Sequence, residues 1–397
     1  MHFLRTIPTP RLLALVVVAV LVAAGGTAIA LGASGSGPVP PAKPLDAAVH
    51  DSLAGPDVQG VSARVEFTNH LIDSAALEGN APLLKGANGR LWLTKGHLRL
   101  ELQSDQGDAQ VVVDRQGFWV YDVSSHTVYR GRLPRERKAE PARKETHGTP
   151  SLAEIRRGIA KVTRHAGVSG AIPVDVGGRP AYDVRITPKQ GGLVGAARLA
   201  FDASHAVPLR VAVYPRGSTS PVLELKATDI SYGRVPASTF SVTAPKGAKV
   251  VDVSPRGGSG STGKKHGHVS GRSAVAKALP FKLAAPSTLG GRRLSEVNLV
   301  GEKSGRGALV TYGQGLGGIA VIEHKAEAGK AAAPPARGEH HGRSLSLPRV
   351  QVGGVSTEEL ATPLGTAIRF ERGGVSYIVI GSVTKATAEA AVRGLLP

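Results

Sequence analysis

A run of twenty residues near the N-terminus, Leu12 to Leu31, constrains this chain more than any other feature. The run contains no charged side chain, and twenty helical residues are long enough to cross the ~30 Å apolar core of a bilayer. Arg5 and Arg11 precede it. By the positive-inside rule, residues 1–11 then stay in the cytoplasm and the rest of the chain is exported. A helix buried in a soluble domain would be expected to carry a polar face, which this run lacks.

The sequence leaves two fates open for this run. As a signal peptide it would be cleaved after the small-residue triplet Ala28-Ile29-Ala30, and the protein would be secreted. As an uncleaved anchor, residues 12–31 would remain as a single transmembrane helix, and the run is long for the apolar region of a signal peptide. We expect the bulk of the chain to be extracytoplasmic in both cases. The chain has no cysteine, so a lipid-modified N-terminal cysteine is excluded.

Composition limits the possible partners. Without cysteine the exported domains cannot form disulfides and must be stable through their cores. The formal net charge is +19, which suits anionic lipid headgroups or anionic wall polymers. Export argues against nucleic acid as a partner. A basic, solvated surface with no specific partner is the plainer interpretation of the same charge.

Composition and turn residues divide the rest of the chain into a spacer (32–44), a large domain (45–254), a Gly/Ser linker (255–277) and a small α+β domain (278–397). In the large domain, short alternating segments bounded by turn residues predict strands. The expected strands there are 58–69, 89–94, 98–103, 109–114, 117–123, 127–133, 172–176, 179–187, 193–202, 208–214, 222–232 and 240–242.

Few helices are expected in the large domain. Residues 45–53 read as a short helix that ends at Gly55-Pro56. A second helix begins after Ser151, because Ser151 and Glu154 form a capping-box pattern. Its apolar stripe, which starts at Leu152, predicts that this helix lies on the sheet. The pattern therefore predicts an α+β domain with one large antiparallel sheet.

The small domain shows the same alternation. Its expected strands are 294–303, 307–311, 319–324, 350–360, 366–371 and 375–382. Residues 384–395 are expected to form a closing helix with Thr384 as its N-cap.

Residues 59–129 resemble the LolA-like exported carrier proteins. The resemblance lies in the opening strand GVSARVEFTNHL, then GRLWL, LRLEL, the segment DRQGFWVYD and TVYR; the later segments PAYDVRITP and LAFDASHAVPLRV fit the same family. The arrangement of a LolA-like domain followed by a smaller C-terminal domain is similar to that of RseB-type regulators of anti-sigma factors. The resemblance implies a curved antiparallel half-barrel with lid helices, and an apolar cavity that receives an acyl chain.

We expect from this resemblance a membrane-associated, extracytoplasmic protein that binds an acyl lipid or a lipoprotein and is not an enzyme. A membrane anchor would prevent free shuttling, so a local carrier or sensor at the membrane surface fits better than long-range transport. The alternative is a protein that regulates an anti-sigma factor by direct contact, with its interior filled by side chains. The residues expected to line the cavity are Leu91, Leu93, Leu98, Leu100 and Leu102, with Trp92 and Trp119.

No catalytic residue, metal site or cofactor is predicted. GSGSTGK (258–264) matches part of a phosphate loop, but Lys265 stands where Ser or Thr should bind Mg²⁺. GQGLGG (313–318) is followed by a strand pattern, whereas a dinucleotide site needs a helix there. The histidine pairs 266/268 and 340/341 lie in loop sequence and lack the helical spacing of a catalytic zinc site. Asp114 and Asp122 are expected to be turn residues.

Overall fold

The computed structural model of the chain describes residues 37–71, 86–104, 107–123, 126–132, 150–252, 269–301, 305–326 and 347–396. The apolar run 12–31, with its cleavage triplet, lies outside the described residues. In the part of the chain that is described, none of the helices has the length and apolar character needed to cross a membrane. The chain divides into two compact units at residues 255–256, and the short segment 190–194 belongs to the second unit.

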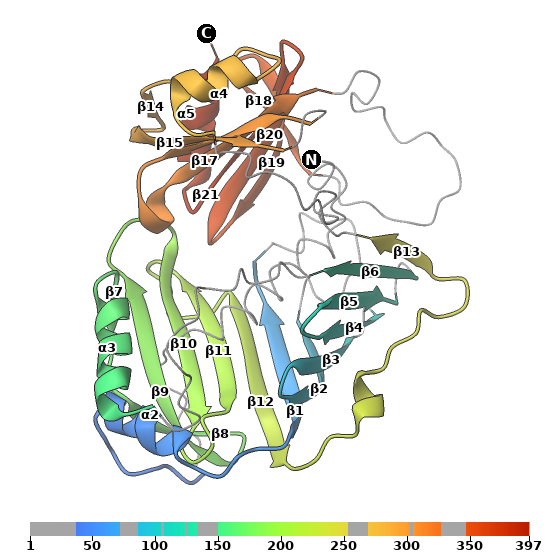
Figure 1. Cartoon of the computed structure of the whole chain (residues 1–397), viewed down its shortest axis with the longest axis vertical. Helices are drawn as coiled ribbons and strands as arrows, with labels where there is room; N and C mark the ends of the chain where they lie inside the picture. Colours follow the sequence, from blue (N-terminus) through green and yellow to red (C-terminus); the bar gives the residue numbers. More distant parts are fainter. Residues whose placement is uncertain are drawn as a thin grey trace. The chain divides into compact units, whose positions relative to one another are not determined.

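The first unit is built on a single large sheet. Its strands are β1 (Val61–Asn69), β2 (Ala87–Thr94), β3 (His97–Ser104), β4 (Gly107–Val113), β5 (Gly117–Asp122), β6 (Thr127–Arg132), β7 (Ala166–Val168), β8 (Ile172–Val176), β9 (Arg179–Pro188), β10 (Val194–Asp202), β11 (Pro208–Pro215), β12 (Leu223–Tyr232) and β13 (Lys249–Asp252). The strand order is β13-β6-β5-β4-β3-β2-β1-β12-β11-β10-β9-β7, and β8 also pairs with β9. Figure 1 shows that the sheet curls, so that β2–β6 run across the direction of β9–β12. The predicted curved α+β sheet is therefore confirmed.

Most of the predicted strands are present, but three features of the sheet differ from prediction. Residues 240–242 are not a strand; a 3-10 turn, η3 (Ala237–Phe240), lies there. Strand β13 follows it and pairs with β6 in parallel, in a sheet that is otherwise antiparallel in its described pairs. Strand β7 was not predicted, because three residues are too few to show alternation.

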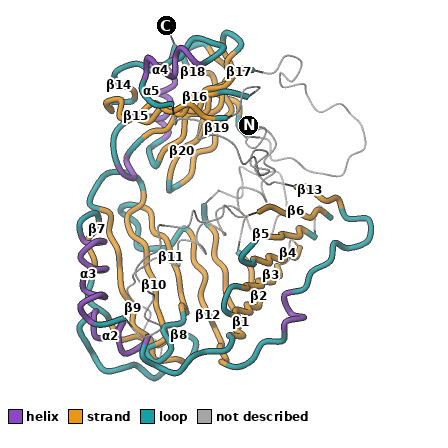
Figure 2. Tube along the Cα trace, viewed as in Figure 1, coloured by secondary structure: helices purple, strands orange, loops and turns teal. Residues whose placement is uncertain are grey.

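The two helices of the first unit lie together. Helix α2 (Leu45–Leu53) places Ala48 against Tyr182 and Phe201 of the sheet. Helix α3 (Leu152–Thr163) begins at the predicted capping box, in which Ser151 accepts from the Glu154 N–H and the Glu154 carboxylate accepts from the Ser151 N–H. Figure 2 shows both helices at the β7–β9 end of the sheet.

The prediction that α3 lies on the sheet is only partly right. No residue of α3 is fully buried, and Leu152 is 37% exposed. The helix packs against α2 and the short edge strand β7 instead of lying across the sheet. Its apolar stripe is therefore only half-covered, and Arg156 joins it to α2 through an ion pair with Asp46.

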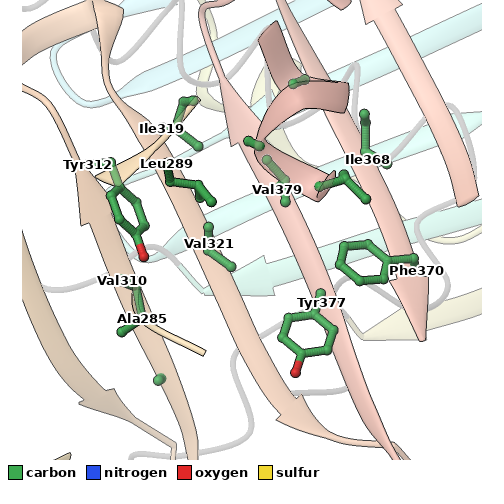
Figure 3. Packing of buried hydrophobic residues seen from close by; sticks show 14 of the residues in the cluster. Ala285, Leu289, Val310, Tyr312, Ile319, Val321, Ile368, Phe370, Tyr377 and Val379 are labelled. Atoms are coloured by element: carbon green, nitrogen blue, oxygen red, sulfur yellow. The ribbon is translucent and has the colours of Figure 1, made fainter. Parts of the chain in front are cut away.

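The second unit is a smaller α+β sheet. Its strands are β14 (Thr288–Leu289), β15 (Arg292–Val300), β16 (Gly307–Tyr312), β17 (Ile319–Lys325), β18 (Arg349–Val352), β19 (Val355–Thr362), β20 (Gly365–Arg372) and β21 (Val375–Gly381), in the order β14-β15-β16-β17-β21-β20-β19-β18. Helices α4 (Arg272–Ala278) and α5 (Lys385–Leu395) contribute Val275, Ala388 and Val392 to its core. Figure 3 shows the centre of this core, where Phe370 stacks on Tyr377.

The second unit confirms the closing helix, with Thr384 accepting from the Thr387 N–H. Two boundaries differ from prediction. The expected strand 350–360 is a hairpin, because Gly353 and Gly354 both adopt positive φ at its centre. Helix α4 lies inside the stretch predicted as linker up to residue 277, so the described second unit already begins at residue 269.

Candidate ligand-binding face of the first sheet

Strand register places all five predicted leucines on one face of the curled sheet. Leu91 lies opposite Ala63 of β1 and Leu100 of β3, and Leu93 lies opposite Leu98. Gly89 lies opposite Leu102 in the same register. Residues that lie directly opposite in an antiparallel pair point to the same side. The five leucines are therefore neighbours on one surface.

The same surface continues across the sheet, and we call it the apolar face. Leu100 lies opposite Val111, Val111 opposite Val120, and Val120 opposite Tyr129. On the other side, Phe67 of β1 lies opposite Leu225 of β12. The apolar face comprises Val61, Ala63, Val65, Phe67, Leu91, Leu93, Leu98, Leu100, Leu102, Ala109, Val111, Val120, Tyr129, Leu225 and Ala227.

Burial varies across the apolar face. Leu100 and Leu102 are 1% exposed, whereas Leu91, Leu93 and Leu98 are only partly buried. The partly buried leucines come from the β2–β3 hairpin, near the middle of the strand order. Apolar surface of this kind gains free energy when hydrocarbon covers it, at about 25 cal/mol per Å². The surface that is not already buried on this face belongs mainly to these three leucines.

The two tryptophans lie on the opposite face of the sheet. Trp92 lies opposite Ser62 and Arg99, and the Arg99 guanidinium lies 6.0 Å from the centre of its ring. Trp119 lies opposite Arg130, with its ring 5.9 Å from that of Tyr121. The seven residues predicted as one lining set are thus split between two faces. Strict alternation in Leu91-Trp92-Leu93 was the signal that could have separated them.

The predicted turn role of Asp114 is confirmed. Its Oδ1 accepts from the backbone N–H groups of Gln116 and Gly117, both at 2.7 Å. Asp122 is also at a strand end, as the last residue of β5 before the β5–β6 turn, but it is 4% exposed and lies opposite Thr127. Asp122 therefore marks a polar end to the apolar face.

One polar cluster was missed from the sequence. Asp202 accepts from the Tyr232 hydroxyl at 2.6 Å, from the backbone of Ser204 and His205, and faces the His205 ring at 3.0 Å. Burial works to raise the pKa of Asp202, but these hydrogen bonds hold it below its usual value. Burial and the same carboxylate raise the pKa of Tyr232. These bonds fix the β10–β11 turn to β12, so the cluster has a structural role.

A second polar cluster lies between β9 and β12. Arg198 lies 3.7 Å from Asp183, and Arg210 pairs with Glu224. Both arginines donate to the Tyr214 hydroxyl, at 3.2 and 3.0 Å. In the register of β11 and β12, Arg210 lies opposite Lys226. Lys226 stands between Leu225 and Ala227, which belong to the apolar face, so its side chain points to the other side. The cluster therefore belongs to the opposite face and balances its own charges.

Of the motifs that could suggest other ligands, only GQGLGG lies in the described residues. Gly315–Gly317 form a 3-10 turn that leads directly into β17, so GQGLGG is a strand connection, as predicted. Residues 258–264 and the histidine pairs 266/268 and 340/341 lie outside the described residues. Across the described ranges there is no cluster of three or more His, Cys, Asp or Glu residues suited to a metal ion.

No protein-family model matches the chain, and no curated protein does. Among solved structures, the chain is similar to MucB in the MucA/MucB complex of Pseudomonas aeruginosa, at 16% identity and a TM-score of 0.38, over 87% of this chain and 94% of that one. A putative outer membrane lipoprotein-sorting protein domain from Vibrio parahaemolyticus matches at 11% identity and a TM-score of 0.23, over 50% and 95%. A LolA superfamily protein from Nitrosomonas europaea matches at 12% identity and a TM-score of 0.21, over 51% and 99%. One of these neighbours carries the LolA superfamily name and another is named as a lipoprotein-sorting domain. The description of the fold rests on the strand order, register and curvature of the sheet.

Proposed function

We propose that the chain is an extracytoplasmic binding protein that holds the acyl chain of a lipid or lipoprotein on the apolar face of its curled sheet. The observation that carries the proposal is the continuity of that face across neighbouring strands. Leu91, Leu93 and Leu98 keep part of their surface uncovered within it. Hydrocarbon is the ligand chemistry that such a surface recognises.

The energetics suit an acyl chain. Each buried methylene contributes about 0.8 kcal/mol, so ten methylenes would contribute about 8 kcal/mol. Part of this is offset by whatever cover must move to admit the chain and by the entropy of binding. The remaining affinity depends on contact area, which makes the leucines of the β2–β3 hairpin the natural test positions.

The proposal includes a membrane location. The run 12–31 has the length and composition of a membrane anchor, and an anchored protein would exchange lipid locally. In this role the protein is a carrier or sensor at the membrane surface and performs no chemical reaction.

The test is native mass spectrometry of the protein purified from its own membrane. Acyl lipid should co-purify with the wild-type chain. Leu93→Asn should strongly reduce the bound lipid, because it places an amide on the apolar face where hydrocarbon would lie. Trp92→Asn is the matched control, since it changes the adjacent residue of the same strand but acts on the opposite face. Circular dichroism would verify that both variants fold.

Two results would contradict the proposal: no acyl lipid on the wild-type chain, or equal lipid on the Leu93→Asn variant. Recovery of a protein partner in place of lipid would support the alternative function. In that case the chain would regulate an anti-sigma factor through protein contact.

A further inference from the structure

Helix α3 carries a stripe of three positively charged side chains. Arg157, Lys161 and Arg164 follow the spacing i, i+4, i+7, which aligns them on one side of the helix. All three side chains are exposed, and no ion pair within 4 Å joins any of them to another described residue, although the charge of Arg157 also acts on the Glu154 carboxylate one turn away. Gly158 and Ala160 beside them are also exposed and small, so the cations stand clear of bulky neighbours.

Helix α5, the other helix of more than ten residues in the described part of the chain, does not carry such a stripe. On α5, Lys385 lies 3.7 Å from Glu389, and Glu389 lies 3.0 Å from Arg393. The charges on α5 alternate in sign along i, i+4 steps and stabilise the helix. On α3 the equivalent steps join like charges, which repel each other. An external anion would relieve that repulsion.

The cationic stripe extends beyond the helix. Lys189, which is exposed, donates from Nζ to the Thr163 carbonyl at the C-terminal end of α3. Arg156, on the same helix, is neutralised within the described residues by Asp46 of α2. The only acidic residue on the helix is Glu154, which accepts from Ser151 in the capping box and lies one turn before Arg157. From Arg157 to the end of the helix, α3 therefore carries no acidic side chain.

The segment that precedes α2 lies at the same end of the first sheet as α3. The Pro41 carbonyl accepts from the Tyr182 hydroxyl at 2.7 Å, and α2, which follows, packs against α3. Only nine residues, 32–40, lie between Leu31, the end of the apolar run, and Pro41. The ten Cα–Cα steps from Leu31 to Pro41 span at most about 36 Å when fully extended. If residues 12–31 lie in a membrane, α3 is held close to the surface of that membrane.

We propose that the stripe Arg157–Lys161–Arg164 docks the first unit on the anionic headgroups of the membrane that holds the N-terminal run. This inference rests on the membrane location in the proposed function, but it does not require an acyl ligand. Each cation near an anionic bilayer strengthens association roughly fivefold, so three contribute about a hundredfold. Docking would hold the unit against the bilayer from which its ligand comes.

The test uses the full chain in lipid nanodiscs. The chain has no native cysteine, so Ala160→Cys gives a single site for an environment-sensitive fluorophore between Arg157 and Arg164. Lipids with a quenching group report contact with the bilayer. We expect strong quenching in discs with phosphatidylglycerol and little in discs of phosphatidylcholine alone. Quenching should fall in 1 M salt, where the Debye length is about 3 Å. A label at Ser238→Cys, an exposed site on η3, should stay unquenched.

Charge variants complete the test. Reversal of all three cations to Glu should abolish the quenching at position 160. Replacement of all three by Gln avoids placing anions at the helix C-terminus and should give the same loss. The control reverses three exposed arginines of the same unit, Arg64, Arg90 and Arg234, and should leave quenching unchanged.

Three results would overturn the docking proposal. The first is a label at position 160 that stays unquenched in anionic discs. The second is quenching that depends neither on lipid charge nor on the charge of the three side chains. The third is failure of the chain to incorporate into discs. Bound acyl lipid, measured by native mass spectrometry on the same Gln variant, should be unchanged. A loss of docking with retained lipid therefore separates this inference from the proposed function.

Discussion

Glu323 is the most deeply buried of the described acidic residues in the second unit. It has no exposed surface, it accepts from the Ala284 N–H at 2.9 Å, and its Oε1 has no hydrogen-bond partner among the described residues. Burial raises its pKa from 4.5 to about 7. Burial raises the pKa of Tyr312 and of Tyr377, and the charge of the nearby Glu323 carboxylate acts in the same direction. The interior of the second unit therefore contains a carboxyl group that keeps its proton to a higher pH than an exposed glutamate does.

We expect the second unit to lose stability as the pH rises from about 4.5 to about 7. Over that range the folded state keeps a proton that the unfolded state has released, so the free energy of unfolding falls with pH. A pKa difference of this size corresponds to roughly 3 kcal/mol. Glu323→Gln should remove most of this slope in urea unfolding at pH 5 and pH 8, because the amide oxygen can still accept from Ala284. The exposed Glu296→Gln is the control, and an unchanged slope in the Glu323 variant would contradict the assignment.

Tyr232 offers a second test at single-residue scale. Tyr232→Phe removes its bond to the Asp202 carboxylate and should cost about 1.5–3 kcal/mol at neutral pH, the range for hydrogen bonds to charged groups. The pKa of Asp202 is lower in the folded protein than its ordinary value of 3.8. The ionised carboxylate therefore contributes fully to the free energy of unfolding above pH 3.8, and this contribution is lost as the pH falls through the folded-state pKa. The variant should therefore lose less stability in acid than the wild type. Tyr121→Phe, which removes a bond to His126, should cost less; equal costs would count against a charge-assisted bond.

At the scale of elements, the two capped helices differ in what else holds them. α3 has a full capping box but no buried residue, whereas α5 has a single cap and buries Ala388, Ala391 and Val392. Ser151→Ala should cost about 1 kcal/mol of helix stability. We expect the α3 amides to exchange with solvent severalfold faster, as hydrogen-exchange mass spectrometry would show. Thr384→Ala should leave α5 protected, and equal deprotection of the two helices would show that packing does not distinguish them.

The elements also show what the sequence could predict. Strands with regular alternation, such as Leu98–Leu100–Leu102 in β3, were found within one or two residues. Strand β13 was not, because four residues carry too little periodicity and its parallel partner β6 lies more than a hundred residues away. The candidate leucines were grouped correctly on one face, since alternation fixes the face. The same alternation separates Trp92, which stands between Leu91 and Leu93 and therefore lies on the other face.

At the scale of the whole molecule, the described strands form two sheets, each with its own hydrophobic core. Without disulfides, each unit depends on its own packing for stability. The buried acid Glu323 belongs to one of these cores alone. Any effect of its ionisation should therefore be local to the second unit if the two units unfold independently.

Calorimetry of the full chain tests this independence. We expect two unfolding transitions, of which only one moves between pH 5 and pH 8 as a result of Glu323 ionisation. A loss of roughly 3 kcal/mol in a unit of this size should lower its midpoint by about 10 °C. Glu323→Gln should abolish that movement and so identify the transition of the second unit, while Tyr232→Phe should lower only the other one. A single transition, or equal responses of both transitions to Glu323→Gln, would show that the two cores unfold as one cooperative structure.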